Sequence, residues 1–263
     1  MKKIINAIHK FLWKIKMLIQ QWLRSCKYRK QLKENLVFQD KYTSEKCCFV
    51  IGNGPSLSEK DLDKIASKGF VTFASNSIFK LFPDTNWRPT YYSVCDTTYF
   101  NKMRQEIETV ECTKFIPIDI YDKYVDNKQD YHVYYRIPHR LFRKYPRFSD
   151  NMTEGFGEGG TVTYHLLQLA VSMGFKEIYL LGCDFNYSFG IGPDGKPFID
   201  NSVQQNHLKQ DNTPIFTPPN LYYNILAFQS AELFTRKHGI RIYNATRGGK
   251  LEIFERKDFD SMF

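Results

Sequence analysis

The chain has 263 residues, of which 42% are hydrophobic and 16% aromatic, and its formal net charge is +9. This length and composition exclude an intrinsically disordered chain and predict one sizeable globular domain, with room for a small accessory segment. The positive charge belongs to one segment, because residues 1–30 hold nine lysines and arginines and no acidic residue. The remainder holds 28 basic and 28 acidic residues, so the charge does not indicate a nucleic-acid-binding protein.

Residues 2–24 have the pattern of a basic amphipathic helix. At about 100° per residue, most apolar side chains fall within one arc of about 140°, and cationic and amide side chains fill the opposite side, with Trp13 and Met17 as exceptions. No run reaches the ~18 uncharged apolar residues of a membrane span, and lysines interrupt any secretory signal core. Basic amphipathic helices with tryptophan and phenylalanine lie in the membrane interface and prefer anionic lipid.

We therefore predict that residues 1–30 form a helix that binds an anionic membrane surface through residues 2–24. The alternative is a helix packed against the body of the protein or against a partner subunit. Residues 31–46, which follow, are predicted to be a polar linker.

From residue 47 onward, short apolar runs alternate with helical patterns. The expected helices are Ser58–Lys68, Thr161–Met173 and Asn220–His238, and Cys183–Pro219 is expected to be a long loop rich in Gly, Pro, Asn and Asp. Such alternation predicts a doubly wound, mostly parallel, Rossmann-like α/β domain over residues 47–263. The expected strands are Cys48–Ile51, Val71–Ala74, Tyr91–Val94, Lys114–Ile118, His132–Arg136, Glu177–Leu181 and Ile240–Tyr243.

The sequence CCFVIGNGPSL at residues 47–57 predicts a strand, a tight glycine turn and a helix N-terminus in series. Backbone N–H groups converge in such a turn, and the helix dipole adds positive charge. Gly52 and Gly54 would let a ligand approach the backbone closely, and Pro55 near the first helical turn would lose no hydrogen bond. A phosphate-bearing molecule is the expected occupant, with an ordinary β-to-α turn as the alternative. The residues assigned to this site are Gly52, Asn53, Gly54, Pro55 and Ser56.

Further candidate binding residues follow other predicted strands. Asn76, Asp96 and Asp184 each stand at or just beyond a strand end, although aspartate there is also a common helix cap and asparagine a common turn residue. A second glycine turn, GEGGT at residues 157–161, opens the helix that follows and offers another anion-binding N-terminus. The carboxyl ends of parallel strands meet at one edge, so these groups should gather and bind a nucleotide or diphosphate.

Three segments of the chain carry a resemblance to a known family. VIGNGPSL, EGGTVTYHLLQLAVSMGFKEIYLLGCDFNYS and IYNATRGGKLEIFERKDFDSMF closely resemble the MptE-like family, over roughly residues 47–263. Its archaeal members are 6-hydroxymethylpterin diphosphokinases, and its bacterial members mostly occur in surface-polysaccharide biosynthesis and flagellin glycosylation. Two of the segments also resemble the sialyltransferases of glycosyltransferase family 42, which use CMP-sialic acid on a single Rossmann-like, GT-A-like domain without a metal.

The second resemblance implies roles for individual residues. Asn53, Gly54 and Asn76 match residues that contact the nucleotide donor in the sialyltransferases. The small-residue turn that holds the nucleotide there matches Gly160 and Thr161, with Gly159 beside them. Asp184 and Phe185 match an Asp-Phe pair that is followed by a phosphate-holding tyrosine. Here Asn186 takes that position and Tyr187 comes one residue later, and His207 matches the general base.

These features predict a glycosyltransferase that moves a CMP-linked acidic sugar, such as a sialic acid or related keto-sugar, onto a cell-surface glycan. His207 would be the general base and Tyr187 would hold the leaving phosphate. The CMP-sugar is the donor substrate, and no tightly bound cofactor is expected. The alternative is pyrophosphate transfer from ATP to a hydroxymethylpterin, with Mg²⁺ held by Asp96 and Asp184. A non-enzymatic binding protein is a third reading.

A lipid-linked glycan acceptor would explain a membrane-binding helix, whereas a soluble pterin would not. We therefore expect a cytoplasmic protein that is peripheral on the inner face of the cell membrane. The sequence is compatible with a monomer or an oligomer.

Overall fold

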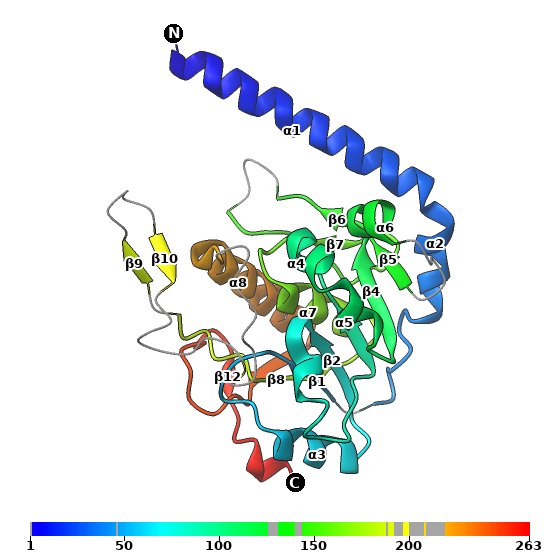
Figure 1. Ribbon diagram of the computed structural model, residues 1–263, viewed down its shortest axis with the longest axis vertical. Helices are drawn as coiled ribbons and strands as arrows, with labels where there is room; N and C mark the ends of the chain where they lie inside the picture. Colours follow the sequence, from blue (N-terminus) through cyan, green and yellow to red (C-terminus); the bar gives the residue numbers. More distant parts are fainter. Residues whose placement is uncertain are drawn as a thin grey trace.

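The computed structural model describes residues 2–45, 47–125, 131–139, 144–187, 189–191, 197–199, 208 and 219–263. An eight-stranded parallel sheet lies at its centre, in the order β12-β11-β8-β1-β2-β3-β4-β5, and helices cover both faces (Figure 1). Its strands are β1 (Cys48–Ile51), β2 (Val71–Ser75), β3 (Tyr91–Ser93), β4 (Thr113–Pro117), β5 (Tyr131–Tyr134), β8 (Glu177–Leu181), β11 (Arg241–Asn244) and β12 (Glu255–Arg256).

The helices and two small two-stranded sheets complete the fold. The α-helices are α1 (Lys2–Lys27), α2 (Arg29–Glu34), α3 (Glu59–Ser67), α4 (Thr97–Lys102), α5 (Arg104–Glu108), α6 (Ile118–Tyr124), α7 (Val162–Ser172) and α8 (Leu221–Lys237). Short 3-10 helices are η1 (Asn35–Val37), η2 (Asn76–Leu81) and η4 (Asp260–Met262). The small sheets pair β6 (Arg136–Ile137) with β7 (Phe156–Gly157), and β9 (Phe189–Ile191) with β10 (Pro197–Ile199).

Successive strand residues alternate between two hydrophobic cores. In β1, Phe49 and Ile51 belong to the core that also contains buried residues of α3 to α6. Cys48 and Val50 belong to the opposite core, which contains buried residues of α7 and α8. Both faces are therefore covered, which explains why the strands read as continuous apolar runs rather than as alternating ones. The predicted doubly wound, parallel α/β class is confirmed.

The prediction of a polar linker over residues 31–46 is wrong, because this segment packs on the body. Leu32 in α2 is buried in one core, and Phe38 in the other. The Asn35 side chain donates to the carbonyl of Val133 in β5 at 2.7 Å. Polar and charged residues flank Leu32, and the apolar run Leu36–Phe38 is too short to show a pattern, so the polar composition conceals the buried positions.

The long loop expected over residues 183–219 also differs from the structure. Its described part contains β9 and β10, which pair antiparallel with Phe189 opposite Ile199.

The strand order places the sheet's reversal point between β1 and β8. From β1 the chain adds β2 to β5 on one side, and from β8 it adds β11 and β12 on the other. In open α/β sheets, ligands bind beyond the carboxyl ends of the strands at such a reversal. The segments that leave this point are the first glycine turn, after Ile51, and the Gly-Cys-Asp-Phe segment, after Leu181.

Helix α1 extends away from the body and reaches it only at its C-terminal end, beside α6 (Figure 1). None of the helices in the described part of the chain combines the length and apolar character that crossing a membrane requires.

Candidate active site

The first glycine turn is filled by the chain's own carboxylate. The N–H of Gly52 donates to the carbonyl of Leu181 at 2.7 Å, and the N–H of Gly54 donates to Gly182 at 2.8 Å. The Ser56 hydroxyl donates to Oδ2 of Asp184 at 2.8 Å. The expectation that these amides converge on a phosphate is therefore wrong for Gly52 and Gly54, because the end of β8 already accepts their hydrogen bonds.

The helix after this turn begins within one residue of the expected Ser58, so the expectation that Pro55 lies near its first turn is wrong. Helix α3 starts at Glu59, and the Ser58 side chain caps it by accepting from the N–H of Asp61. Pro55 lies in a separate turn ahead of that cap. The positive end of α3 is thus displaced from the glycine turn and contributes less there than the sequence indicates.

Asp184 is a structural centre of this edge. Asp184 is only 8% exposed. Burial raises the pKa of its carboxyl group, and hydrogen bonds from the side chain and backbone of Ser56 partly offset this rise. Its carbonyl accepts from the N–H of Lys250 at 2.7 Å. The neighbouring Arg247 pairs with Asp61 at 2.6 Å and Asp260 at 2.9 Å. The tail segment around Arg247 therefore helps to hold Asp184 in place.

Two asparagines connect the turn to the end of β2. The Asn53 amide donates to the carbonyl of Ser75 at 2.9 Å, and its Oδ1 is buried without a partner among the described residues. Asn76 has a φ of 47°, and its carbonyl accepts from the Tyr92 hydroxyl at 2.6 Å. A positive φ outside glycine costs energy and is concentrated at functional sites. An unpartnered acceptor at Asn53 leaves room for a donor on a ligand.

Asp96 caps α4, since its side chain accepts from the N–H of Tyr99 at 2.7 Å. Asp184 likewise has one carboxylate oxygen engaged by Ser56. Among the residues that the structure describes, no group of three or more His, Cys, Asp or Glu side chains could hold a metal ion. Asp96 and Asp184 therefore form no three-ligand site with other described residues, and a magnesium ion held by these two alone would also need phosphate ligands.

The second glycine turn offers the open anion-binding amides. Thr161 caps α7 by accepting from the N–H of Thr163 at 3.3 Å. The N–H groups of Gly160, Thr161 and Val162 have no partner among the described residues. They lie at the positive end of an eleven-residue helix. The capacity to bind a phosphate therefore lies at α7.

Helix α8 fixes the shape of this second turn. The Tyr223 hydroxyl donates to the carbonyl of Glu158 at 2.8 Å. A Cβ on Gly159 would lie 2.4 Å from Tyr164 and 2.6 Å from Ala227, and Gly160 has a φ of +71°. Only glycine satisfies both demands, so the turn is preorganised before any ligand arrives.

A cluster of charges beside this turn escaped the sequence analysis. Arg136 donates to Asp119 at 3.0 Å and to the carbonyl of Cys95 at 3.2 Å, and it lies 3.8 Å from Glu158. Burial would lower the pKa of Arg136, but the two carboxylates raise it instead. Burial raises the pKa of Glu158, which Arg136 partly offsets. Arg136 and Asp119 both follow strands, so the strand-end rule applied throughout would have found them.

His165 lies buried under this cluster. Its Nδ1 is 3.2 Å from the Tyr134 hydroxyl, and burial, together with Arg136, lowers its pKa to about 3. A histidine in an unfolded chain has a pKa of about 6.5. Between pH 3 and pH 6.5 the unfolded chain therefore binds a proton that the folded chain excludes. Stability must therefore fall as the pH drops through this window.

We expect His165→Asn to weaken that pH dependence. Between pH 7 and 5 the buried histidine should cost the wild type about 2 kcal/mol of unfolding free energy, a loss that the variant lacks. Urea titrations of both proteins at pH 7, 6 and 5 measure this. Parallel curves for the two proteins would show that folding does not lower the pKa of His165.

Phe185, Tyr187 and His207 complete the predicted site. Phe185 has a φ of 51°, and its ring lies 5.9 Å from that of Tyr187 in an edge-on contact. Burial raises the pKa of Tyr187, with Cys183 and Asp184 adding to the effect, so its hydroxyl keeps its proton and can donate. His207 lies outside the described residues.

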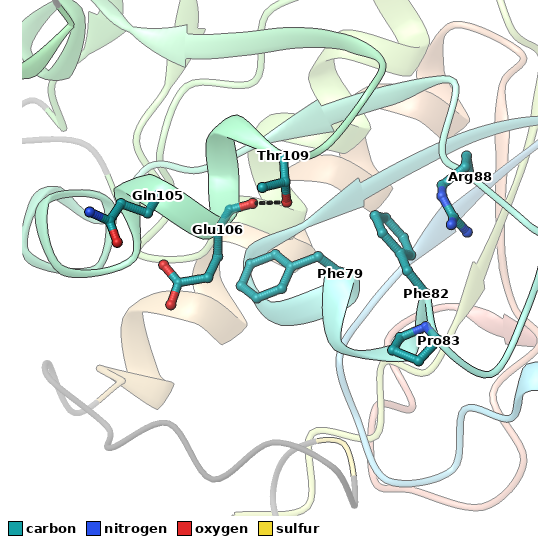
Figure 2. Close-up of a pocket in the computed structure, with 7 residues that line it drawn as sticks. All are labelled: Phe79, Phe82, Pro83, Arg88, Gln105, Glu106 and Thr109. Atoms are coloured by element: carbon teal, nitrogen blue, oxygen red, sulfur yellow. Dashed lines mark hydrogen bonds between the residues drawn. The ribbon is translucent and has the colours of Figure 1, made fainter.

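A surface groove of about 550 Å³ lies apart from all these residues (Figure 2). The Phe79 ring lies between Glu106 of α5 and Phe82, and the Arg88 guanidinium is 4.2 Å from the Phe82 ring centre. Nη1 of Arg88 donates to the carbonyls of Thr85 and Trp87. The groove is a gap between η2 and α5 and holds no convergent polar groups. It is lined by Phe79, Phe82, Pro83, Arg88, Gln105, Glu106 and Thr109.

Fold and site together define a doubly wound α/β protein whose candidate ligand-binding edge lies around two glycine turns. The sequence profile described as 6-hydroxymethylpterin diphosphokinase MptE-like matches residues 21–190, and the chain belongs to the MptE-like family. The match begins within α1 and covers α2, which agrees with the packing of residues 31–45 on the body. It ends before the tail segment in which the sequence resemblance also appears.

Two solved structures resemble the fold. The Maf glycosyltransferase from Magnetospirillum magneticum AMB-1 is 15% identical, with a TM-score of 0.51 over 82% of this chain and 34% of that one. The chain thus spans about a third of the length of that protein. The sialyltransferase CstII from Campylobacter jejuni, in complex with a substrate analogue, cytidine-5'-monophosphate, is 18% identical, with a TM-score of 0.44 over 81% of this chain and 84% of that one. At 15% identity the first likeness establishes a shared fold alone. Comparison with curated proteins gives no match.

Proposed function

We propose that the protein is a glycosyltransferase that takes an acidic sugar from a CMP-linked donor and transfers it to a cell-surface glycan. The observation that carries this proposal is the open N-terminus of α7. Its three unpartnered amides, at Gly160, Thr161 and Val162, suit a phosphate group. The fold shared with the Maf glycosyltransferase is consistent with this activity.

The nucleoside would lie across the strand ends toward the first glycine turn. That turn carries no free amide at Gly52 or Gly54, which suits an uncharged part of the ligand. The buried, unpartnered Oδ1 of Asn53 would accept from the 4-amino group of cytosine or from a ribose hydroxyl. An acceptor left buried without a donor is costly, so a ligand that supplies one gains affinity and selectivity.

The reaction would break the bond between the anomeric carbon and the phosphate oxygen, and CMP would leave with the electron pair. The acceptor hydroxyl would form the new bond to that carbon while its proton passes to His207. Tyr187 would donate its hydroxyl hydrogen to the departing phosphate, because its pKa is raised and it stays protonated. The α7 amides would stabilise the same developing charge. No step in this scheme requires a metal ion.

A second candidate is pyrophosphate transfer from ATP to a hydroxymethylpterin, which the description of the family favours. Mg²⁺ would stabilise the charge on the transferred phosphates. Asp96 and Asp184 are the carboxylates at this edge, but each already accepts a hydrogen bond from the protein. The fit of this chain to that chemistry is therefore poorer at the residues that would have to hold the metal.

A thermal-shift panel with CMP, CDP, UDP, GDP and ATP, with and without Mg²⁺, separates the two functions. At a ligand concentration of about 100 Kd, binding adds about 2.7 kcal/mol of stability, or about 5–10 °C in Tm for a domain of this size. We expect CMP to give this shift without magnesium, and CMP-sialic acid to release CMP when acceptor glycan is added. A shift with ATP alone, and only with magnesium, would establish the diphosphokinase reading instead.

A further inference from the structure

Helix α1 is joined to the body through its polar side. The carboxylate of Asp122 in α6 lies 2.6 Å from Nζ of Lys27 and 3.8 Å from Nε of Arg24. The buried Tyr28 donates its hydroxyl hydrogen to the same carboxylate at 2.5 Å. At about 100° per residue, Arg24 and Lys27 project from the side of the helix opposite the apolar arc. The contact with α6 therefore uses the cationic face.

The apolar side of α1 consequently faces solvent. Trp22 is 62% exposed and Phe11 is 54% exposed, although such side chains are usually buried when a partner surface exists. The set of large exposed apolar residues in α1 is Phe11, Leu12, Trp13, Ile15, Leu18, Ile19, Trp22 and Leu23. The alternative in which this face packs on the body is thus not the arrangement found. A contiguous exposed patch of this kind marks an interaction surface.

The helix is attached at the edge of the sheet that carries the candidate site. Helix α6 begins at Ile118, directly after β4 ends at Pro117, so Asp122 lies beyond the carboxyl end of that strand. The Arg136 cluster, which also uses α6 through Asp119, lies on the same side. In Figure 1, α1 runs past α6 and the labels of β6 and β7 at this end of the molecule.

We propose that α1 lies in the surface of an anionic lipid bilayer and that Asp122 is the joint that turns the carboxyl edge of the sheet toward that surface. Residues 1–30 hold nine cationic side chains and no acidic one, which complements a negatively charged membrane. Lysine and arginine flanks with tryptophan on the buried side are typical of helices that lie in the membrane interface. The proposal does not depend on which group the body transfers, because membrane binding is measured without turnover.

Vesicle co-sedimentation of the full chain tests the anchor. We expect binding to vesicles of phosphatidylcholine with phosphatidylglycerol, and at least tenfold weaker binding to phosphatidylcholine alone. Two neighbouring positions give matched variants, because Ile19 lies in the apolar arc and Gln20 on the polar side, and both are exposed. Ile19→Glu and Gln20→Glu add the same charge. Gln20→Glu should weaken binding about fivefold, and Ile19→Glu at least tenfold further.

If Ile19→Glu and Gln20→Glu weaken vesicle binding equally, the apolar arc is not buried in the lipid. Equal binding to charged and neutral vesicles would overturn the anionic surface as the partner. If the chain failed to bind vesicles and sedimented as an oligomer that Ile19→Glu dissociates, the occupant of the apolar face would be a second copy. Normal nucleotide-induced thermal shifts in these variants would leave the proposed function standing in each case.

Energy transfer to an acceptor dye in the lipid tests the joint. Thr98 lies in α4, just after the carboxyl end of β3, and Ser67 lies at the opposite edge, at the end of α3 before β2. In a Cys26→Ser background, a donor dye at Thr98→Cys should transfer more efficiently than one at Ser67→Cys. Asp122→Ala should remove this difference while vesicle binding persists. Equal energy transfer from the two positions while Asp122 is intact would overturn the proposal that the carboxyl edge of the sheet faces the membrane.

Discussion

Replacing Gly54 with alanine should lower the free energy of unfolding by about 3–5 kcal/mol. The new Cβ would lie 1.8 Å from Oδ2 of Asp184 and 2.7 Å from the carbonyl oxygen of Gly182. Neither atom can move away without breaking a hydrogen bond. Asp184 is held by Ser56, and Gly182 accepts the N–H of Gly54 itself. The substitution must therefore either expel a buried carboxylate or separate the ends of β1 and β8.

Gly69→Ala is the matched control for this prediction. Gly69 has a φ of +68°, but a Cβ there meets nothing within 4 Å. Its cost is backbone strain alone, about 1–2 kcal/mol. Urea denaturation of the two variants and the wild type separates the contributions. If Gly54→Ala loses no more stability than Gly69→Ala, then Asp184 does not fill the turn in solution.

The central strands could be predicted from the sequence because both faces of a parallel sheet are buried. Cys48–Ile51 and Glu177–Leu181 are short apolar runs bounded by glycine, and each forms the expected strand. The same reasoning fails for residues 31–46. There Leu32, Asn35 and Phe38 are the buried residues, in a stretch that also holds lysines and a glutamate. Burial on one side of a short, charged helix leaves too few apolar positions to show a period.

The candidate site was predictable as a location and not as a set of contacts. Strand ends gather at one edge, and Asn53, Asn76 and Asp184 lie at that edge, while their binding roles stay predictions. Asp184 fills the first glycine turn because β1 pairs with β8. This pairing brings together Ser56 and Asp184, which are more than a hundred positions apart in the chain. Local sequence cannot show which amides are already used. Arg136 stands at the end of the predicted strand His132–Arg136, so the strand-end rule points to it as well, but its pairing with Asp119 and Glu158 could not be read from the local sequence.

Replacing Val162 with proline should weaken nucleotide binding about 10- to 100-fold while leaving α7 folded. Val162 is the first residue of α7, where proline is favoured because its missing N–H has no partner within the helix. Thr161, before it, has a φ of −145° and a ψ of 141°, a conformation that a following proline tolerates. The substitution thus removes one amide from the proposed phosphate site. A hydrogen bond to a charged group contributes about 1.5–3 kcal/mol, which corresponds to that loss of affinity.

Val162→Ala separates the amide from the side chain. The Val162 side chain is buried in the core that α7 and α8 share. Both variants therefore lose packing, and without ligand both should have a lower Tm than the wild type. Only the proline variant loses the N–H. Titration with CMP by calorimetry should therefore give near-normal affinity for Val162→Ala and a much weaker Kd for Val162→Pro. Since the amide is the single difference in hydrogen bonding between them, equal Kd values would place the phosphate somewhere other than the N-terminus of α7, and would remove the observation on which the proposed transfer from a CMP-linked sugar rests.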